Sequence, residues 1–85
     1  MDYTVIDTTP GAGTFLSPPA DWEGDYTALM RDRYKALRWG QEFVSAAMQS
    51  DTVPITITGP YARDAAQILI RIGARATNIS TEEAA

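Results

Sequence analysis

The sequence contains no cysteine and no histidine. Without cysteine there can be no disulfide, no thiolate nucleophile and no cysteine-ligated metal. Without histidine the chain lacks the commonest general base and transition-metal ligand, so Ser-His and Cys-His mechanisms are excluded. The carboxylates, hydroxyls and guanidinium groups that remain are not assembled into a site by any motif. We therefore predict a protein that is not an enzyme and that has no catalytic residues, no cofactor and no metal.

Long hydrophobic runs are also missing from the sequence. No segment approaches the about 20 apolar residues that a helix needs to cross a bilayer. The first residues carry neither the positive charge nor the apolar stretch of a signal peptide. These features predict a soluble chain without membrane contact that is not Sec-exported and is located in the cytoplasm or within a viral particle.

The chain does have enough apolar material for one small domain. Hydrophobic residues make up 45% of its 85 residues, with two Trp, four Tyr and two Phe, so residues 1–85 can bury one modest core. The net charge is −4, and the first 25 residues hold five acids and no base, while an acidic tail over 80–85 adds two acids. The acidic N-terminal segment is therefore attracted to the mildly basic remainder of the chain, which favours its docking on its own domain or on a neighbouring copy.

Hydrophobic periodicity and turn residues predict five elements of secondary structure. Runs of β-branched and aromatic residues indicate strands, and the 3.6-residue period of apolar side chains, with Asp25 as an N-cap, indicates the first helix. The predicted elements are a strand over 3–7, a helix over 26–49, a strand over 53–58, a helix from Pro60 to Gly73 and a strand over 75–79.

This order of elements predicts a small α/β (or α+β) domain. We expect a two-layer β-α-β-α-β sandwich, with two helices on one face of a short three-stranded sheet. The last strand, helix and strand have the length of a βαβ unit, so these strands should pair in parallel. Residues 53–58 alternate, with Ile55 and Ile57 on one face and threonines on the other, which indicates a sheet covered on one face only.

Residues 8–24 predict a long N-terminal loop or arm. They contain three prolines and three glycines in 17 residues, a composition that breaks regular structure. Phe15, Leu16 and Trp22 also lie in this segment, and a purely flexible linker has no use for such side chains. We expect the segment to pack either on its own domain or on a neighbouring chain.

The predicted helix over 26–49 has apolar residues on two faces. The broader stripe is the expected core face, whereas Trp39 and Phe43 point away from it and need a second cover. Either the 8–24 segment folds back over them or another chain covers them. The predicted interface residues are Phe15, Leu16, Trp22, Trp39 and Phe43. The predicted core stripe is Tyr26, Leu29, Met30, Tyr34, Leu37, Gly40, Val44, Ala47 and Met48.

Two short polar clusters border the predicted strands. Thr58-Gly59-Pro60 lies where a strand's carboxyl end meets a helix N-terminus, a place where backbone dipoles favour an anion. Pro60 removes one N–H donor, however, and a plain helix-start turn explains the same residues. For Asp7-Thr8-Thr9 we expect a strand stop whose side chains bond turn backbone groups.

Together these features favour a non-enzymatic protein-interaction or assembly module that self-associates or joins a larger assembly. The most specific hypothesis is a small accessory structural subunit of a multi-chain particle such as a bacteriophage virion. One alternative is a small acidic regulatory or inhibitor protein that binds a basic host protein, and a second is a weak anion or nucleotide binder at Thr58-Gly59-Pro60. Nucleic acid is not an expected partner, because a chain with net charge −4 is repelled by a phosphate backbone.

Overall fold

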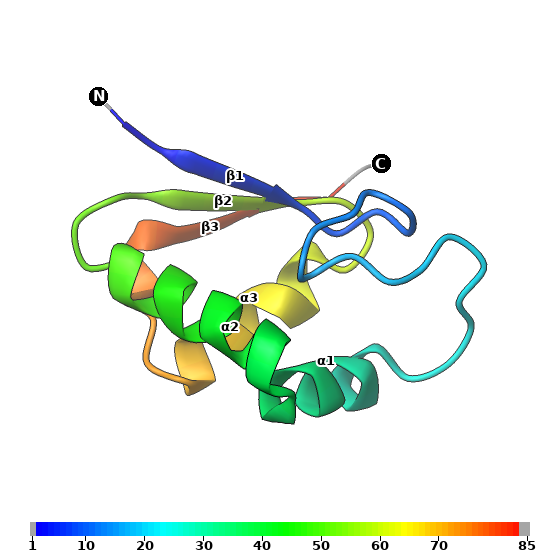
Figure 1. The fold of residues 1–85 in the computed structure, drawn as a ribbon. Helices are drawn as coiled ribbons and strands as arrows, with labels where there is room; N and C mark the ends of the chain where they lie inside the picture. The colour runs from blue at the N-terminus through cyan, green and yellow to red at the C-terminus, as the bar shows by residue number, and fades with distance from the viewer. Residues whose placement is uncertain (1, 84–85) are drawn as a thin grey trace.

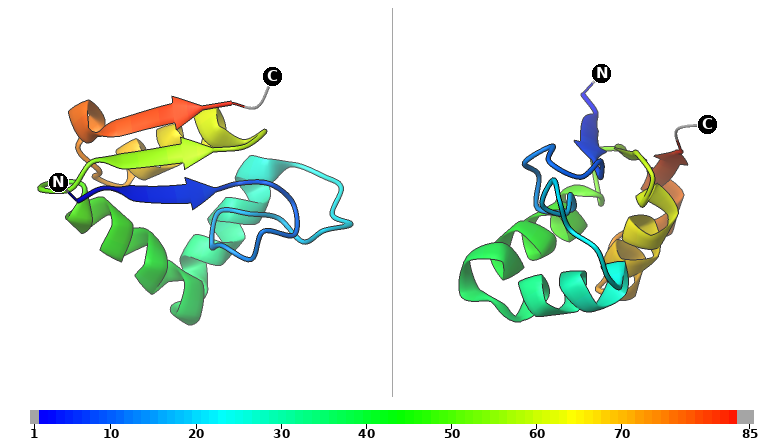
Figure 2. Two further views of the ribbon diagram at one scale, coloured as in Figure 1. Left: turned by 90° about the horizontal axis from the view of Figure 1, so that it is seen from above. Right: turned by 90° about the vertical axis from the view of Figure 1, so that its right-hand side faces the viewer.

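A computed structural model describes residues 2–83 as a small α/β domain in two layers (Figure 1). Three parallel strands in the order β1-β2-β3 form one layer, and the helices lie against a single face of this sheet, as the second pair of views also shows (Figure 2). The elements are β1 (Thr4–Asp7), α1 (Tyr26–Lys35), α2 (Leu37–Gln49), β2 (Ile55–Thr58), α3 (Ala62–Arg71), the 3-10 turn η1 (Ala76–Asn78) and β3 (Ile79–Glu82).

The sheet follows the sequence pattern closely. Ile55 and Ile57 of β2 are fully buried against the helices, while Thr56 and Thr58 face the open side, which confirms the predicted alternation. The parallel pairing is also confirmed, with Ile55 opposite Ile79. The third strand begins at Ile79 rather than at residue 75, because η1 occupies the intervening residues.

The prediction of a single helix over 26–49 is wrong, because the chain breaks at Ala36. The backbone of Ala36 is extended, with φ −76° and ψ 136°, and its N–H closes the last turn of α1. A straight helix of that length would extend about 36 Å, as long as the largest dimension of the domain, 35 Å. The break lets α1 and α2 lie at an angle under the same short sheet (Figure 1).

The break also changes the buried face predicted for α2. In α1 the expected core residues Tyr26 and Met30 are buried. In α2 the expected core residue Ala47 is buried as well, but Phe43 and Ala46 are buried beside it. The predicted stripe was phased from α1 through a continuous helix, and that phase is lost at Ala36. Four other residues of the predicted core stripe are exposed: Tyr34, Leu37, Val44 and Met48.

Residues 8–24 do not extend from the body as an arm. The segment turns back toward α1 and α2 (Figure 2), and its residues Phe15, Leu16 and Pro18 are buried. Of the two alternatives for this segment, packing on its own domain is the one that the structure has.

The predicted acidic tail over 80–85 is shorter than expected. Residues 80–82 belong to β3, and residues 84–85 lie outside the described part of the chain. Within residues 2–83, no helix has the length and hydrophobicity needed to span a membrane.

Candidate functional site

Three of the five predicted interface residues lie in the domain's own core. Leu16 and Phe43 have no exposed surface and Phe15 very little. The rings of Phe15 and Phe43 meet edge to face, with centroids 4.9 Å apart, an arrangement that favours aromatic pairs. The 8–24 segment therefore covers Phe43 within the same chain, and these three side chains offer nothing to a partner.

Trp39, the fourth predicted interface residue, is half-buried and helps to hold the 8–24 segment through its contact with Arg33. The Arg33 guanidinium stacks over its ring, with Cζ 4.7 Å from the centroid. The same guanidinium donates through Nη1 to the carbonyl oxygens of Phe15 at 2.8 Å and Ser17 at 2.9 Å. Because a planar guanidinium can stack and donate at once, Arg33 ties the segment to α1 and α2 together.

Trp22, the fifth predicted interface residue, is also half-buried and belongs to an aromatic group at the other end of the segment. Its ring meets Tyr61 edge to face at 6.3 Å, and Tyr61 stacks flat on Tyr26 at 4.4 Å. The Tyr26 hydroxyl donates to the carbonyl oxygen of Leu16 at 2.7 Å, and burial raises the pKa of Tyr26 above its ordinary value. The neutral hydroxyl thus remains a donor, and both tryptophans serve the fold.

In the Thr58-Gly59-Pro60 turn the Gly59 N–H donates to the Glu82 carbonyl oxygen at 3.2 Å, and Pro60 has no N–H. The buried Thr8 hydroxyl accepts from the Tyr61 N–H at 3.0 Å and donates to the Thr58 carbonyl oxygen at 2.7 Å. The Ala62 N–H donates to the Gly59 carbonyl oxygen at 3.2 Å. Gly59 is required here, since its φ is +97° and a Cβ would lie 2.6 Å from the Thr8 hydroxyl oxygen.

Carboxylates surround this turn and disfavour an anion there. A shallow hollow of about 390 Å³ beside it is lined by Asp7, Glu82 and Glu83, together with Thr9, Thr58 and Gly59. Asp7 accepts from the Thr9 N–H at 2.9 Å and from its hydroxyl at 2.7 Å, and these bonds lower the pKa of Asp7. The cluster therefore acts as a strand stop and carries negative charge.

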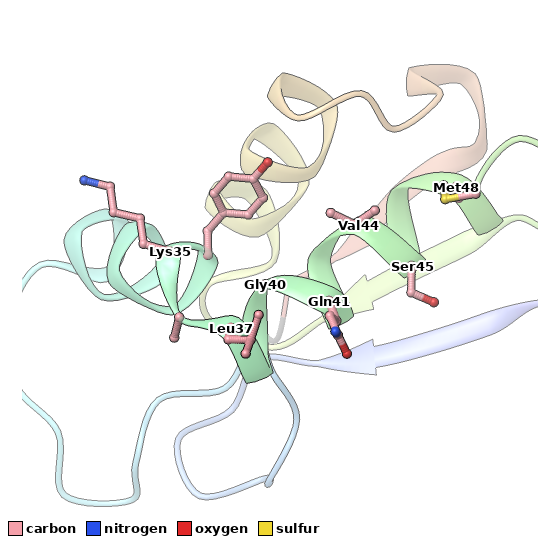
Figure 3. A pocket seen from close by; sticks show the side chains of 9 residues that line it. Lys35, Leu37, Gly40, Gln41, Val44, Ser45 and Met48 are labelled. Carbon is pink, nitrogen blue, oxygen red and sulfur yellow. The ribbon is translucent and has the colours of Figure 1, made fainter.

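Four of the seven large exposed apolar side chains among the described residues lie together at the corner between α1 and α2. Leu37 is 86% exposed and Met48 69%, and Tyr34 and Val44 are about half exposed. They line a groove of about 600 Å³ that runs along α2 (Figure 3). The other lining residues are Lys35, Ala36, Gly40, Gln41 and Ser45. We call this surface the α2 groove.

Local sequence explains the shape of the α2 groove. The extended Ala36 turns the chain between the helices, and Gly40 fits into the corner because a Cβ there would lie 2.6 Å from the Tyr34 carbonyl oxygen. The small residues Gly40 and Ser45 leave the middle shallow, while Leu37 and Met48 lie toward opposite ends of α2 (Figure 3). Lys35 is the one charged residue of the lining.

The α2 groove was not predicted from the sequence, because Tyr34, Leu37, Val44 and Met48 were assigned to the core. A signal was present nonetheless: the region 26–49 has more apolar side chains than one covered face can bury, and one of its two apolar faces had to remain outside. Gly40, a poor helix former, marked the place where the helix phase could change.

Among residues 2–83, no three carboxylates are placed so that they could hold one metal ion. The strongest candidate for a functional site is the α2 groove, because four large apolar side chains are exposed there. Comparisons of the chain with protein-family models, with curated proteins and with solved structures find no match.

Proposed function

We propose that this chain is a non-enzymatic protein-interaction module whose docking face is the α2 groove. The observation that carries the proposal is the exposure of Leu37 and Met48, at 86% and 69%, beside half-exposed Tyr34 and Val44. These four side chains line one groove, and the largest exposed apolar patch of a monomer is often functional. Water-exposed apolar surface of this extent favours burial against a protein.

A structural role in a multi-chain particle, such as a bacteriophage virion, is the specific form of this function that we propose. A subunit of such a particle meets more than one neighbour, and the domain has a second uncovered surface on the opposite layer. The sheet is parallel but covered on one face only (Figure 2), although parallel sheets normally have both faces covered. Tyr3 and Val5 are exposed on β1 and the residue before it.

The alternative of an acidic inhibitor of a basic protein is favoured by a different feature. The hollow lined by Asp7, Glu82 and Glu83 gives one end of the sheet negative charge that a basic partner would complement. The two functions differ in their response to salt. Binding through the acidic hollow weakens steeply as ionic strength rises, whereas burial of the α2 groove does not.

The proposal is tested by the size of the complex that the tagged chain forms in an extract of the cells that produce it. We expect the wild-type chain to run above its monomer mass of 9.3 kDa and the double variant Leu37→Ser, Met48→Ser to run as the monomer. A control, Ile70→Ser, removes an exposed apolar side chain of α3 outside both the groove and the open face of the sheet, and should keep the complex. A wild-type chain that remains a monomer in the extract would refute the proposed function.

A further inference from the structure

We infer that the occupant of the α2 groove is a second copy of the same chain, with the two α2 helices packed antiparallel about a two-fold axis. This inference rests on the proposed function and names its partner. Three features of the groove support it: the spacing of its residues, the distribution of charge along it and the exposed apolar side chains at its centre.

Three apolar residues of the groove, together with Gln41, have the spacing of a helix-pairing seam. Leu37, Gln41, Val44 and Met48 lie four, three and four positions apart along α2, which is the spacing that keeps a seam facing a partner helix. The seam is about 16 Å long at 1.5 Å per residue. Gly40 and Ser45 flank its middle, so that two helix backbones can approach closely there.

An antiparallel pairing makes this seam complementary to itself. With the axis between Gln41 and Val44, the large side chains at the ends meet, Leu37 against the partner's Met48, and the smaller central residues face each other. Figure 3 shows Leu37 and Met48 toward opposite ends of α2, with Gln41 and Val44 between them. A closed dimer of this kind uses one surface twice and leaves no open interface for further growth.

Charge along the groove also favours the antiparallel direction. Lys35, at the N-terminal end of the seam, comes to lie beside the C-terminal end of the partner's α2, where carbonyl oxygens carry the negative end of the helix dipole. Asp51 follows that end directly, and its side chain is 63% exposed while it lies 3.8 Å from Arg75. A parallel pairing would instead place Lys35 against the partner's Lys35, which costs free energy.

The exposed apolar side chains supply the centre of such a contact. Leu37 and Met48 expose most of their surface and Tyr34 and Val44 about half, and a standard interface buries about 800 Å² on each partner, so polar residues around them must contribute the rest. The polar lining residues Lys35, Gln41 and Ser45 and the flanking end of α2 supply a rim. An apolar centre with a polar rim is the usual composition of a specific interface.

The first test is the mass of the purified chain as a function of its concentration, by sedimentation equilibrium. We expect the wild-type chain to have the mass of a dimer, twice 9.3 kDa. The double variant Leu37→Ser, Met48→Ser should have a dimer dissociation constant about 100-fold higher or more. Unchanged far-ultraviolet circular dichroism would show that the variant folds, and Ile70→Ser, on α3, is the control. A purified chain that stays monomeric up to millimolar concentration overturns the inference.

The second test is the direction of packing, and the absence of cysteine from the chain makes it clean. A mixture of Leu37→Cys and Met48→Cys chains should be joined by a short bismaleimide, whereas Leu37→Cys alone should not. Efficient joining of Leu37→Cys to itself overturns the antiparallel arrangement. Val5→Cys, on the sheet layer, serves as the negative control.

The failures of the two proposals can be told apart. A chain that is monomeric when purified, but that forms a complex in the native extract which Leu37→Ser with Met48→Ser abolishes, has a different protein in the groove. That result overturns the second-copy inference and leaves the proposed function standing. A chain that is monomeric in both preparations refutes both.

Discussion

Replacing Phe43 by alanine measures directly which face of α2 is the core. Phe43 has no exposed surface. Its ring meets the rings of Phe15 and Tyr34 edge to face, with centroids 4.9 and 5.8 Å apart. Removing a buried phenylalanine costs about 3–5 kcal/mol through lost transfer free energy and the cavity left behind. A domain of this size has a free energy of unfolding of roughly 4–13 kcal/mol, so Phe43→Ala should lose a large part of it.

The adjacent residue provides the control for this prediction. Val44 is half exposed in the α2 groove, so Val44→Ala should change the free energy of unfolding of the monomer by less than about 0.5 kcal/mol. Phe43→Leu, which keeps much of the volume, should lose about 1–2 kcal/mol and gives a measurable transition if Phe43→Ala does not fold.

Urea unfolding followed by tryptophan fluorescence gives these free energies, because Trp22 and Trp39 both pack against the core that contains Phe43. The measurements should be made on the Leu37→Ser, Met48→Ser background, so that association does not add to the stability of the folded chain. A loss larger for Val44→Ala than for Phe43→Ala would show that the core face is the one predicted from a continuous helix, and the packing described above would be wrong.

Two further predictions concern the 8–24 segment and the strand stop. Arg33→Lys removes the guanidinium group that stacks on Trp39 and donates to the 8–24 segment. The free energy of unfolding should therefore fall by about 1–2 kcal/mol, and limited proteolysis within residues 8–24 should accelerate. Arg31→Lys, on the exposed side of α1, should change neither quantity, and equal proteolysis rates for the two variants would contradict the role of Arg33. The bonds from Thr9 lower the pKa of Asp7 below its ordinary 3.8, so their contribution to stability is present above that ordinary pKa and is lost as the pH falls through the lower folded pKa. Thr9→Val should raise the pKa of Asp7 toward 3.8 in an NMR titration, and an unchanged pKa would show that the hydroxyl contributes nothing.

The strands and the last helix could be predicted because local pattern and tertiary environment agree there. Ile55 and Ile57 alternate with threonines, and the structure buries the first pair and leaves the second near solvent. Pro60 and Gly73 bracket α3 as the helix-start and helix-end preferences of these residues require. The start of β3 was misplaced, since the bonds of Arg75 and Asn78 to Ser50, which hold η1 in place, join residues far apart in sequence.

The candidate site could not be predicted because it depends on one backbone angle. Alanine is the strongest helix former, so nothing in the residue type at position 36 announces an extended conformation. A single break there rotates α2, moves Phe43 inward and leaves Leu37 and Met48 outside. The sequence did indicate a second apolar face on residues 26–49, at Trp39 and Phe43, and left open whether the 8–24 segment or another chain covers it; in the structure the 8–24 segment packs against Phe43.

The pairing of β1 with β2 has a consequence for how this chain reaches its fold. The bonds that fix it join residues about fifty positions apart, such as Thr8 and Thr58, whereas β2, α3 and β3 follow one another directly. Closing a long loop costs conformational entropy before any contact rewards it, so non-local strand pairing slows folding. The C-terminal strand–helix–strand unit is therefore expected to assemble first, and the N-terminal strand to complete the sheet as the late and rate-limiting step.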